Sequence, residues 1–158
     1  MKTAFFTGHR TFNYDKEVFD KLKDLLIRLA KEGVTDFYAG GAQGWDMMFE
    51  LAVLKLRDYH VPFLKLHMVL PCPPEEQTAK WNQSDKNTYK KILEAADSVE
   101  IVSEHYDKNC MKKRNQRLVE LGDICVCYYN VNKTRSGTGQ TVRFAEKQEK
   151  EVINILEL

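Results

Sequence analysis

One stretch, Phe37 to Asp46, constrains the fold of this chain more than any other. A short aromatic run, residues 37–39, is typical of a β-strand and stops at two glycines. A largely apolar run, residues 47–56, is long enough for a helix. In many α/β proteins a strand, a glycine turn and a helix in succession direct backbone N–H groups at an anion. The glycine spacing is neither that of a dinucleotide fingerprint nor that of a Walker loop. The turn by itself is therefore as consistent with a plain connection as with a phosphate cradle.

Patterns typical of strands and helices alternate along the rest of the sequence. Strands are expected at residues 3–6, 37–39, 63–70, 99–102, 124–129 and 152–156, of which 124–129 is the most β-prone and is predicted to be central. Helices are expected between an Asp15 cap and Gly33, over residues 47–56 and 86–96, around residues 114–119, and after residues 136–141. Residues 71–85 show no clear period and are predicted to form a long loop. The alternation predicts one α/β domain over residues 1–158, Rossmann-like, with a mostly parallel sheet and helices on both faces.

Charge and cysteine content narrow the classes of partner and cofactor. The chain has 24 basic and 23 acidic residues, a formal net charge of +1, so no overall electrostatic field favours nucleic acid or a membrane surface. The four cysteines form no C-x-x-C pair and no zinc-site spacing with the four histidines, so no metal site is predicted. No apolar run reaches membrane-spanning length and nothing resembles a signal peptide, so the expected location is the cytoplasm, with reduced thiols.

Four segments near the ends of expected strands carry residues suited to binding a phosphate. Thr7-Gly8-His9-Arg10 follows the first strand, residues 40–46 follow the second, Arg114-Asn115 lies beyond the fourth, and residues 136–141 lie beyond the fifth. In an open α/β sheet such segments converge at the carboxyl edge of the strands, where ligands bind. Backbone N–H groups, threonine hydroxyls and two arginines together suit a phosphate attached to a sugar-like group.

These segments are similar to motifs of the SLOG superfamily, the SMF/DprA–LOG-like Rossmann proteins, and most closely to its small YpsA-like branch. The resemblance rests on Phe6-Thr7-Gly8-His9-Arg10, on Gly40-Gly41-Ala42-x-Gly44-x-Asp46 with Glu50, on Gln77-x-x-x-Trp81, on Arg114-Asn115 and on Ser136-Gly137-Thr138-Gly139-x-Thr141-Val142. It implies a modified Rossmann fold, a bound nucleotide or nucleotide-derived small molecule, and a homodimer, but no settled reaction and no certain cofactor. The candidate ligand-binding residues are Thr7, Gly8, His9, Arg10, Gly40, Gly41, Ala42, Gly44, Asp46, Glu50, Trp81, Arg114, Asn115, Gly137, Thr138, Gly139 and Thr141.

Three functions remain open from the sequence. The first is a sensing or regulatory module that binds a nucleotide-derived molecule and controls a protein partner. The second is a nucleotide N-glycosidase. The phosphoribohydrolase (LOG) members carry P-G-G-x-G-T-x-x-E, and the position of that glutamate is Thr141 here, so Asp46 or Glu50 would have to be the general acid or base. The third, binding of single-stranded nucleic acid as in the DprA members, needs a basic groove with stacking aromatics and is disfavoured by the near-neutral charge.

Several of the candidate residues also have a purely structural interpretation. Asp46 suits a helix N-terminus through the dipole alone; as a ligand contact it would accept from ribose hydroxyls or loop amides while the phosphate lies over residues 137–141. For Glu50 the structural interpretation is a solvated charge, but in an otherwise apolar helix the carboxylate is expected to be buried and partnered, which favours a role in the site. His9 is expected to hydrogen-bond within its turn. Trp81 is either a hydrophobic plug under the long loop or a lid on which a base stacks.

Overall fold

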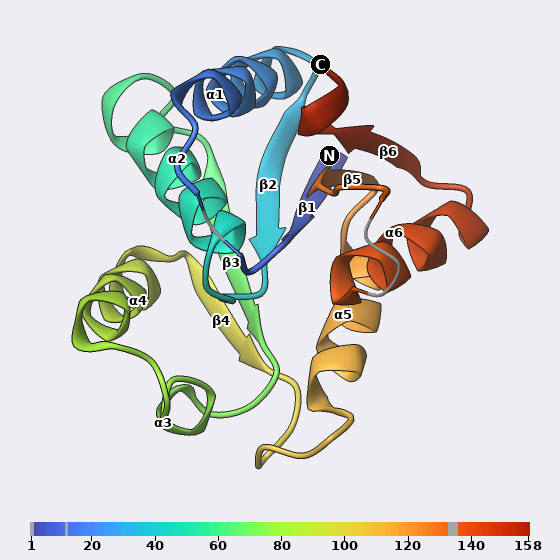
Figure 1. Ribbon diagram of the computed structural model, residues 1–158. Coiled ribbons are helices and arrows are strands. Elements are labelled where there is room, and N and C mark those ends of the chain that lie inside the picture. The colour runs from blue at the N-terminus through green and yellow to red at the C-terminus, as the bar shows by residue number, and fades with distance from the viewer. Residues whose placement is uncertain (1, 12, 133–135) are drawn as a thin grey trace.

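Six parallel strands form one sheet in the computed structural model, which describes residues 2–11, 13–132 and 136–158 (Figure 1). The order across the sheet is β4-β3-β2-β1-β5-β6, and every neighbouring pair is parallel. The predicted α/β Rossmann-like fold with a parallel sheet is therefore confirmed. The strands are β1 (Lys2–Gly8), β2 (Val34–Ala39), β3 (Lys65–Leu70), β4 (Ser98–Ile101), β5 (Ile124–Tyr128) and β6 (Glu151–Asn154).

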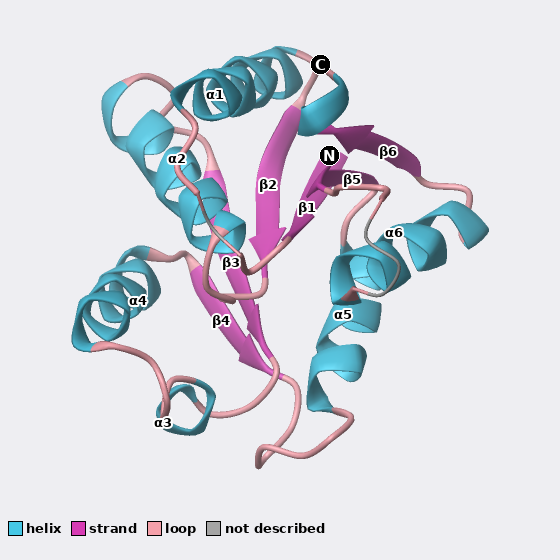
Figure 2. Ribbon diagram, in the orientation of Figure 1, coloured by secondary structure: helices cyan, strands magenta, loops and turns pink. Residues whose placement is uncertain are grey.

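Helices cover both faces of the sheet, as Figure 2 shows with helices in cyan and strands in magenta. The helices α1 (Lys16–Lys31), α2 (Trp45–Tyr59) and α4 (Gln83–Ala95) lie on one side, and α5 (Cys110–Leu121) and α6 (Gly137–Lys147) lie on the other. Consecutive residues of β1 point to opposite faces, as they must in a strand. Phe6 stacks on Phe49 of α2 with ring centroids 4.6 Å apart, and Phe5 belongs to the core cluster beneath α5 and α6.

The order of the strands fixes where a ligand can enter. On one side of β1 lie β2, β3 and β4, in that order. The chain then crosses to the other side, where β5 lies next to β1 and β6 lies next to β5. Between β1 and β5 the connections leave in opposite directions, which opens a crevice at the carboxyl ends of the strands. This switch point brings the segments after β1, β2 and β5 to one edge of the sheet.

The start and end of the first helix agree with the sequence. Asp15 caps α1, its Oδ1 accepting hydrogen bonds from the N–H groups of Glu17 and Val18. Just beyond the helix, Gly33 adopts a φ of +99°, a conformation that glycine takes without the steric cost of a Cβ.

Elsewhere the boundaries differ from those expected, mostly where exposed polar residues form helical turns. Residues 71–85 are not one loop: they contain the single turn α3 (Pro74–Gln77), and α4 begins at Gln83, where the Asn82 side chain accepts from the Asp85 N–H at 2.8 Å. Residues 137–141 form the first turns of α6 because the Ser136 hydroxyl caps that helix. The strand expected at 124–129 is interior, but β1 and β2 are the middle strands. Residues 155–157 form a 3₁₀ turn, η1 (Ile155–Glu157), after β6. Among the described residues, no helix is both long and apolar enough to cross a membrane.

Candidate functional site

The glycine turn after β2 is held by two carboxylates of the helix that follows it. Asp46 Oδ2 accepts a hydrogen bond from the Ala42 N–H at 3.2 Å, and one turn later Glu50 Oε2 accepts from the Gly41 N–H at 3.0 Å. Because these two N–H groups already donate to carboxylates of the chain, they are not open to a phosphate. The phosphate-cradle interpretation of this turn is therefore not supported, and its acidic side chains define a different kind of site.

Both carboxylates are buried, with Asp46 5% and Glu50 0% exposed. Burial raises the pKa of Asp46 to about 6, although the charge of Arg114 and the Ala42 N–H act to lower it. Burial also raises the pKa of Glu50, and the neighbouring charge of Asp46 raises it further. Asp46 Oδ1 and Glu50 Oε1 are buried without a hydrogen-bond partner among the described residues. An oxygen in that condition is poised to accept a hydrogen bond from a ligand if it faces a cavity.

The Arg114 side chain extends from α5 to the Gly40 carbonyl oxygen, just beyond the end of β2. Its guanidinium is buried, donates from one terminal nitrogen to the Gly40 carbonyl oxygen, and donates through Nε to Asn115 Oδ1 at 2.8 Å. A Cβ on Gly40 would collide with this guanidinium, so the glycine is required by the close approach of the arginine. Burial lowers the pKa of Arg114, and the charge of Asp46 opposes that effect.

A cavity of about 270 Å³ lies at the switch point between β1 and β5. It collects most of the predicted ligand-binding residues, and four residues that were not predicted also line it. The predicted residues are Thr7, Gly8, His9, Arg10, Ala42, Asp46, Arg114, Asn115, Gly137 and Thr138; the others are Phe6, Thr11, Leu118 and Ser136. Four segments far apart in the sequence thus share one cavity: the end of β1, the turn from β2 into α2, α5, and the start of α6.

The N-terminus of α6 forms one wall of this cavity. Ser136 Oγ accepts from the Gly139 N–H at 2.9 Å, while Gly137 and Thr138, whose backbones are in the first helical turn, line the cavity. The first N–H groups of a helix have no acceptor within the helix and carry the positive end of its dipole. This wall therefore favours an anionic group, as the sequence had suggested for residues 137–141.

Other predicted residues lie outside this cavity and support it. Gly41 has a φ of +71° and faces Tyr89 and Leu70 rather than the cavity. The Thr141 hydroxyl, predicted to contact ligand, donates instead to the Gly137 carbonyl oxygen at 2.8 Å within the helix. The remaining residues of this kind are Gly40, whose carbonyl holds Arg114, Gly44, which packs on the Arg10 backbone, Gly139, which faces Tyr129, and Glu50.

The His9 imidazole joins two loops at the cavity. Its Nε2 accepts a hydrogen bond from the Asn130 N–H at 2.9 Å, and its ring lies 5% exposed beside Tyr128 and Tyr129. The bond ties the segment after β1 to the segment after β5, so the interaction reaches across the switch point rather than staying within the turn that was expected.

Trp81 lines a second cavity, of about 530 Å³, that shares Arg10 and Ala42 with the first. Tyr106 and Met111, which the sequence analysis missed, also line it. Met111 could have been found from its spacing: it lies three residues before Arg114 on α5, and residues at that spacing share a helix face.

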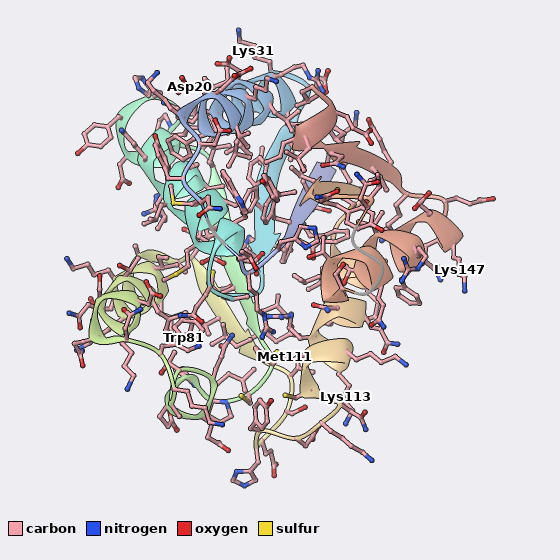
Figure 3. All side chains as sticks on the ribbon, in the orientation of Figure 1. Asp20, Lys31, Trp81, Met111, Lys113 and Lys147 are labelled. Carbon is pink, nitrogen blue, oxygen red and sulfur yellow. The ribbon has the colours of Figure 1, made fainter. Side chains whose placement is uncertain are left out.

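A third groove, of about 330 Å³, runs between α5 and α6 on the outside of the molecule. Lys112, Arg143 and Lys147 line it together with Phe144. It provides a local basic surface that the near-neutral net charge did not predict. Figure 3 labels Lys113 and Lys147 on this side of the molecule.

Comparison with known proteins agrees with the architecture. The YpsA family model, described as the YspA SLOG family, matches residues 5–158. The chain is 28% identical over 153 residues to the UPF0398 protein BH1768 of Halalkalibacterium halodurans, covering 96% of this chain and 78% of that protein. It is 29% identical over 144 residues to the uncharacterized SPbeta prophage-derived protein YoqJ of Bacillus subtilis, covering 80% of this chain and 81% of that protein.

Two solved structures share the fold. TM1055, a structural genomics target, superposes with a TM-score of 0.60 at 20% identity, covering 96% of this chain and 72% of that one. The Moco carrier protein of Chlamydomonas rheinhardtii superposes with a TM-score of 0.50 at 14% identity, covering 96% and 73%. Since the family model spans nearly the whole chain, this protein belongs to the YspA SLOG family.

Proposed function

We propose that the chain binds a nucleotide-derived small molecule, carrying a phosphate and a ribose, in the switch-point cavity, and acts as a ligand-sensing module. One observation carries the proposal. Asp46 Oδ1, buried and without a partner among the described residues, belongs to a side chain that lines the same cavity as the N-terminus of α6. A carboxylate side chain and a set of donors for an anion therefore line one small space.

The phosphate half of the proposal rests on α6 and on two arginines. The N–H groups at the start of α6 and the dipole of that helix favour an anion. Arg10 and Arg114 add positive charge to the same cavity. Asp46 would repel a phosphate placed beside it, so the phosphate belongs at the Gly137 side.

The ribose half rests on Asp46. A carboxylate is an acceptor-only group when ionised, and the hydroxyls of a ribose are donors of the right kind. Asp46 Oδ2 already accepts from the Ala42 N–H, and the Gly8 N–H also acts on the carboxylate, so a ligand hydroxyl would add a further hydrogen bond to this side chain. The Chlamydomonas protein that shares the fold is named a Moco carrier, which agrees with the use of this fold to hold a ligand.

One observation, the raised pKa of Asp46, favours a second candidate function, that of a nucleotide N-glycosidase. A general acid or base works best with a pKa near the operating pH, and burial raises the pKa of Asp46 to about 6. Glu50, the other carboxylate suggested from the sequence, holds the Gly41 N–H and does not line the cavity. If the chain is an enzyme, Asp46 is therefore the residue that touches the substrate.

Gly137→Val tests the binding site with little risk to the fold. The nearest described atom to a Cβ on Gly137 is Asn115 Nδ2 at 3.9 Å, so the added side chain enters the cavity without a clash. The variant should melt like the wild type but lose the thermal stabilisation that nucleoside monophosphates produce in the wild type. Glu146→Val, at an exposed position of the same helix, is the matched control and should keep the full shift. Equal shifts in all three proteins would refute the site.

The same proteins separate the two candidate functions. Incubation with a panel of nucleoside monophosphates should give stabilisation without release of free base if the chain is a sensor. Base release that Asp46→Asn abolishes would establish the glycosidase instead, since the amide keeps the size of the side chain and removes its acid–base capacity. Arg114→Ala is a less informative variant, because it also removes the hydrogen bond to the Gly40 carbonyl oxygen.

A further inference from the structure

We infer that the second cavity, lined by Trp81, Tyr106 and Met111, binds the planar base of the ligand whose phosphate lies at α6. The inference rests on the proposed function and narrows it: the ligand is a nucleotide, not a sugar phosphate. Figure 3 shows Trp81 and Met111 beyond the carboxyl ends of the strands, Trp81 on the α3–α4 side and Met111 on the α5 side. We call this space, defined by the residues that line it, the Trp81 chamber.

The two cavities are continuous in their lining. Arg10 and Ala42 belong to both, and Arg10 NH2 lies 3.5 Å from the Met111 sulfur. The switch-point cavity, at about 270 Å³, is smaller than the roughly 300–1,000 Å³ typical of small-molecule sites. A nucleotide that fills it with ribose and phosphate must place its base outside it, and the Trp81 chamber is the adjoining space.

The Trp81 ring is held in place by a chain of contacts that leads back to the glycine turn. Trp81 packs edge-to-face on Tyr89, with ring centroids 5.2 Å apart and planes at 85°. The Tyr89 hydroxyl donates to Gln77 Oε1 at 2.6 Å, and Gln77 Nε2 donates to the Gly41 carbonyl oxygen at 3.3 Å. The Trp81 ring and the turn that positions Asp46 are thus joined by one continuous chain of contacts.

This arrangement favours the stacking interpretation of Trp81. Trp81 packs against the core as a plug would, but it is only half-buried and also lines a cavity, which an enclosed plug would not do. An aromatic ring that is already fixed loses little side-chain entropy when a base stacks on it. Such stacking is tolerant of the identity of the base, because every base has a π-face.

The chamber also has polar atoms at its rim. Gln43 Nε2 donates to Asp85 Oδ2 at 2.8 Å, which orients the amide of a residue that lines the chamber. Glu76 Oε1 accepts from the Tyr106 N–H at 3.1 Å and so fixes the backbone that carries the second aromatic side chain. The rim is therefore ordered by its own hydrogen bonds, as expected of a recognition surface that is formed before the ligand arrives.

The test compares ligands with and without a base on the full chain. Calorimetric titrations with ribose 5-phosphate, the four common nucleoside monophosphates and adenosine would be run on the wild type, Trp81→Ala, Trp81→Phe and Tyr106→Ala. Trp81→Ala should weaken the tightest nucleotide by roughly 5- to 150-fold and leave the affinity for ribose 5-phosphate unchanged. Trp81→Phe should keep most of the nucleotide affinity. Tyr106 is 59% exposed, so Tyr106→Ala probes the chamber even if Trp81→Ala fails to fold.

Three outcomes would count against this inference or against the function on which it rests. If ribose 5-phosphate binds the wild type as tightly as any nucleotide, or if Trp81→Ala and Tyr106→Ala both keep full nucleotide affinity, the chamber does not hold a base. If adenosine binds in a Trp81-dependent way while Gly137→Val does not weaken the binding of any nucleoside monophosphate, the chamber stands and the phosphate site at α6 is wrong. If none of these ligands binds, both proposals fail. Tyr59→Ala, which truncates an aromatic side chain that is 74% exposed and outside both cavities, is the control.

Discussion

Gly44 lies directly against the backbone of Arg10: a Cβ built on the glycine would be 2.5 Å from the Arg10 carbonyl oxygen. Gly44 also has a φ of +83°, and the next residue, Trp45, donates its N–H to the His9 carbonyl oxygen at 3.4 Å. The segment after β1 is thus fitted onto the turn after β2 by backbone contact. This contact sets the distance between Arg10 and Asp46 in the switch-point cavity.

Gly44→Ala should destabilise the fold more than Gly33→Ala, because at Gly44 a positive φ is combined with the close approach of the Arg10 backbone. Both glycines have a positive φ, so both variants lose the roughly 1–3 kcal/mol that an L-residue forfeits there. Gly33 has nothing within 4 Å of its Cβ position, whereas Gly44 has the Arg10 backbone. Urea unfolding of the two variants gives the comparison. Equal losses of unfolding free energy would show that the two segments are not in fixed contact.

The raised pKa of Asp46 predicts a pH dependence of stability. The folded-state pKa of about 6 exceeds the unfolded value of 3.8, so the folded protein holds a proton that the unfolded chain has lost. The stabilising effect is complete below pH 4 and is lost as the pH rises through 6. It amounts to at most roughly 3 kcal/mol. Asp46→Asn cannot titrate, so its unfolding free energy should fall less than that of the wild type between pH 4 and pH 7. Parallel curves for the two proteins, measured by urea unfolding, would contradict the shift.

Asp36 should show the opposite dependence. Burial acts to raise the pKa of Asp36, but hydrogen bonds from Thr35 Oγ1 at 2.7 Å and His67 Nε2 at 2.6 Å outweigh it and lower the pKa. The stabilisation is therefore present above the unfolded pKa and is lost as the pH falls through the lower folded value. Asp36→Asn should cost about 1.5–3 kcal/mol at pH 7, the range for hydrogen bonds to a charged group.

Two comparisons check the Asp36 prediction. The deficit of Asp36→Asn should shrink as the pH falls below the unfolded pKa of 3.8, because the wild type then loses the stabilisation that its ionised carboxylate supplies. Ser98→Ala removes only the far end of the network, where Ser98 Oγ lies 2.6 Å from His67 Nδ1, and its smaller effect should not change over that range. A constant deficit for Asp36→Asn at all pH values would mean that the lost interaction does not depend on charge.

The chain should not bind single-stranded DNA tightly at physiological salt. Its net charge is +1, and the basic groove between α5 and α6 contains only three cationic side chains, Lys112, Arg143 and Lys147, among its described lining residues. Fluorescence anisotropy with a labelled oligonucleotide at several salt concentrations measures this. Sub-micromolar affinity with a steep salt dependence, which reports counterion release, would promote the nucleic-acid function. Arg143→Glu combined with Lys147→Glu would then show whether the groove is responsible.

The sequence predicted the sheet, and the edge at which its turns converge, because both follow from apolar periodicity and topology. Strands and the buried faces of helices produce a regular spacing of apolar residues in the sequence. In a parallel sheet the loops after β1, β2 and β5 must lie at the same edge. The first turn of α4 was missed because its residues are polar and exposed, so they carry no such period. The start of α6 was misplaced because Gly137 and Gly139 disfavour a helix, and the Ser136 cap together with tertiary packing outweighs that preference.

Within the site, sequence reasoning placed the residues better than it placed their free hydrogen-bonding groups. The Gly41 and Ala42 N–H groups are engaged by Glu50 and Asp46, a pairing that depends on the angle at which α2 leaves the turn. The Trp81 chamber also could not be predicted, since Trp81, Tyr106 and Met111 come from three separate segments. Their approach depends on how the loops after β3 and β4 fold over the edge of the sheet.

The position of β1 has a consequence for how the molecule is made. Ala4 pairs with Phe37 of β2 on one side and with Ile124 of β5 on the other. One edge of β1 therefore stays unpaired until β5 has been synthesised. During N-to-C synthesis, β2, β3 and β4 can assemble on β1 while its second edge remains unpaired. An unpaired edge is a template for association with other chains. The switch-point cavity, which needs Thr7 of β1 and Gly137 of α6, forms only when β5 and α6 have joined the sheet. A small molecule bound in it would therefore stabilise the finished protein but would not protect the nascent chain while that edge is unpaired.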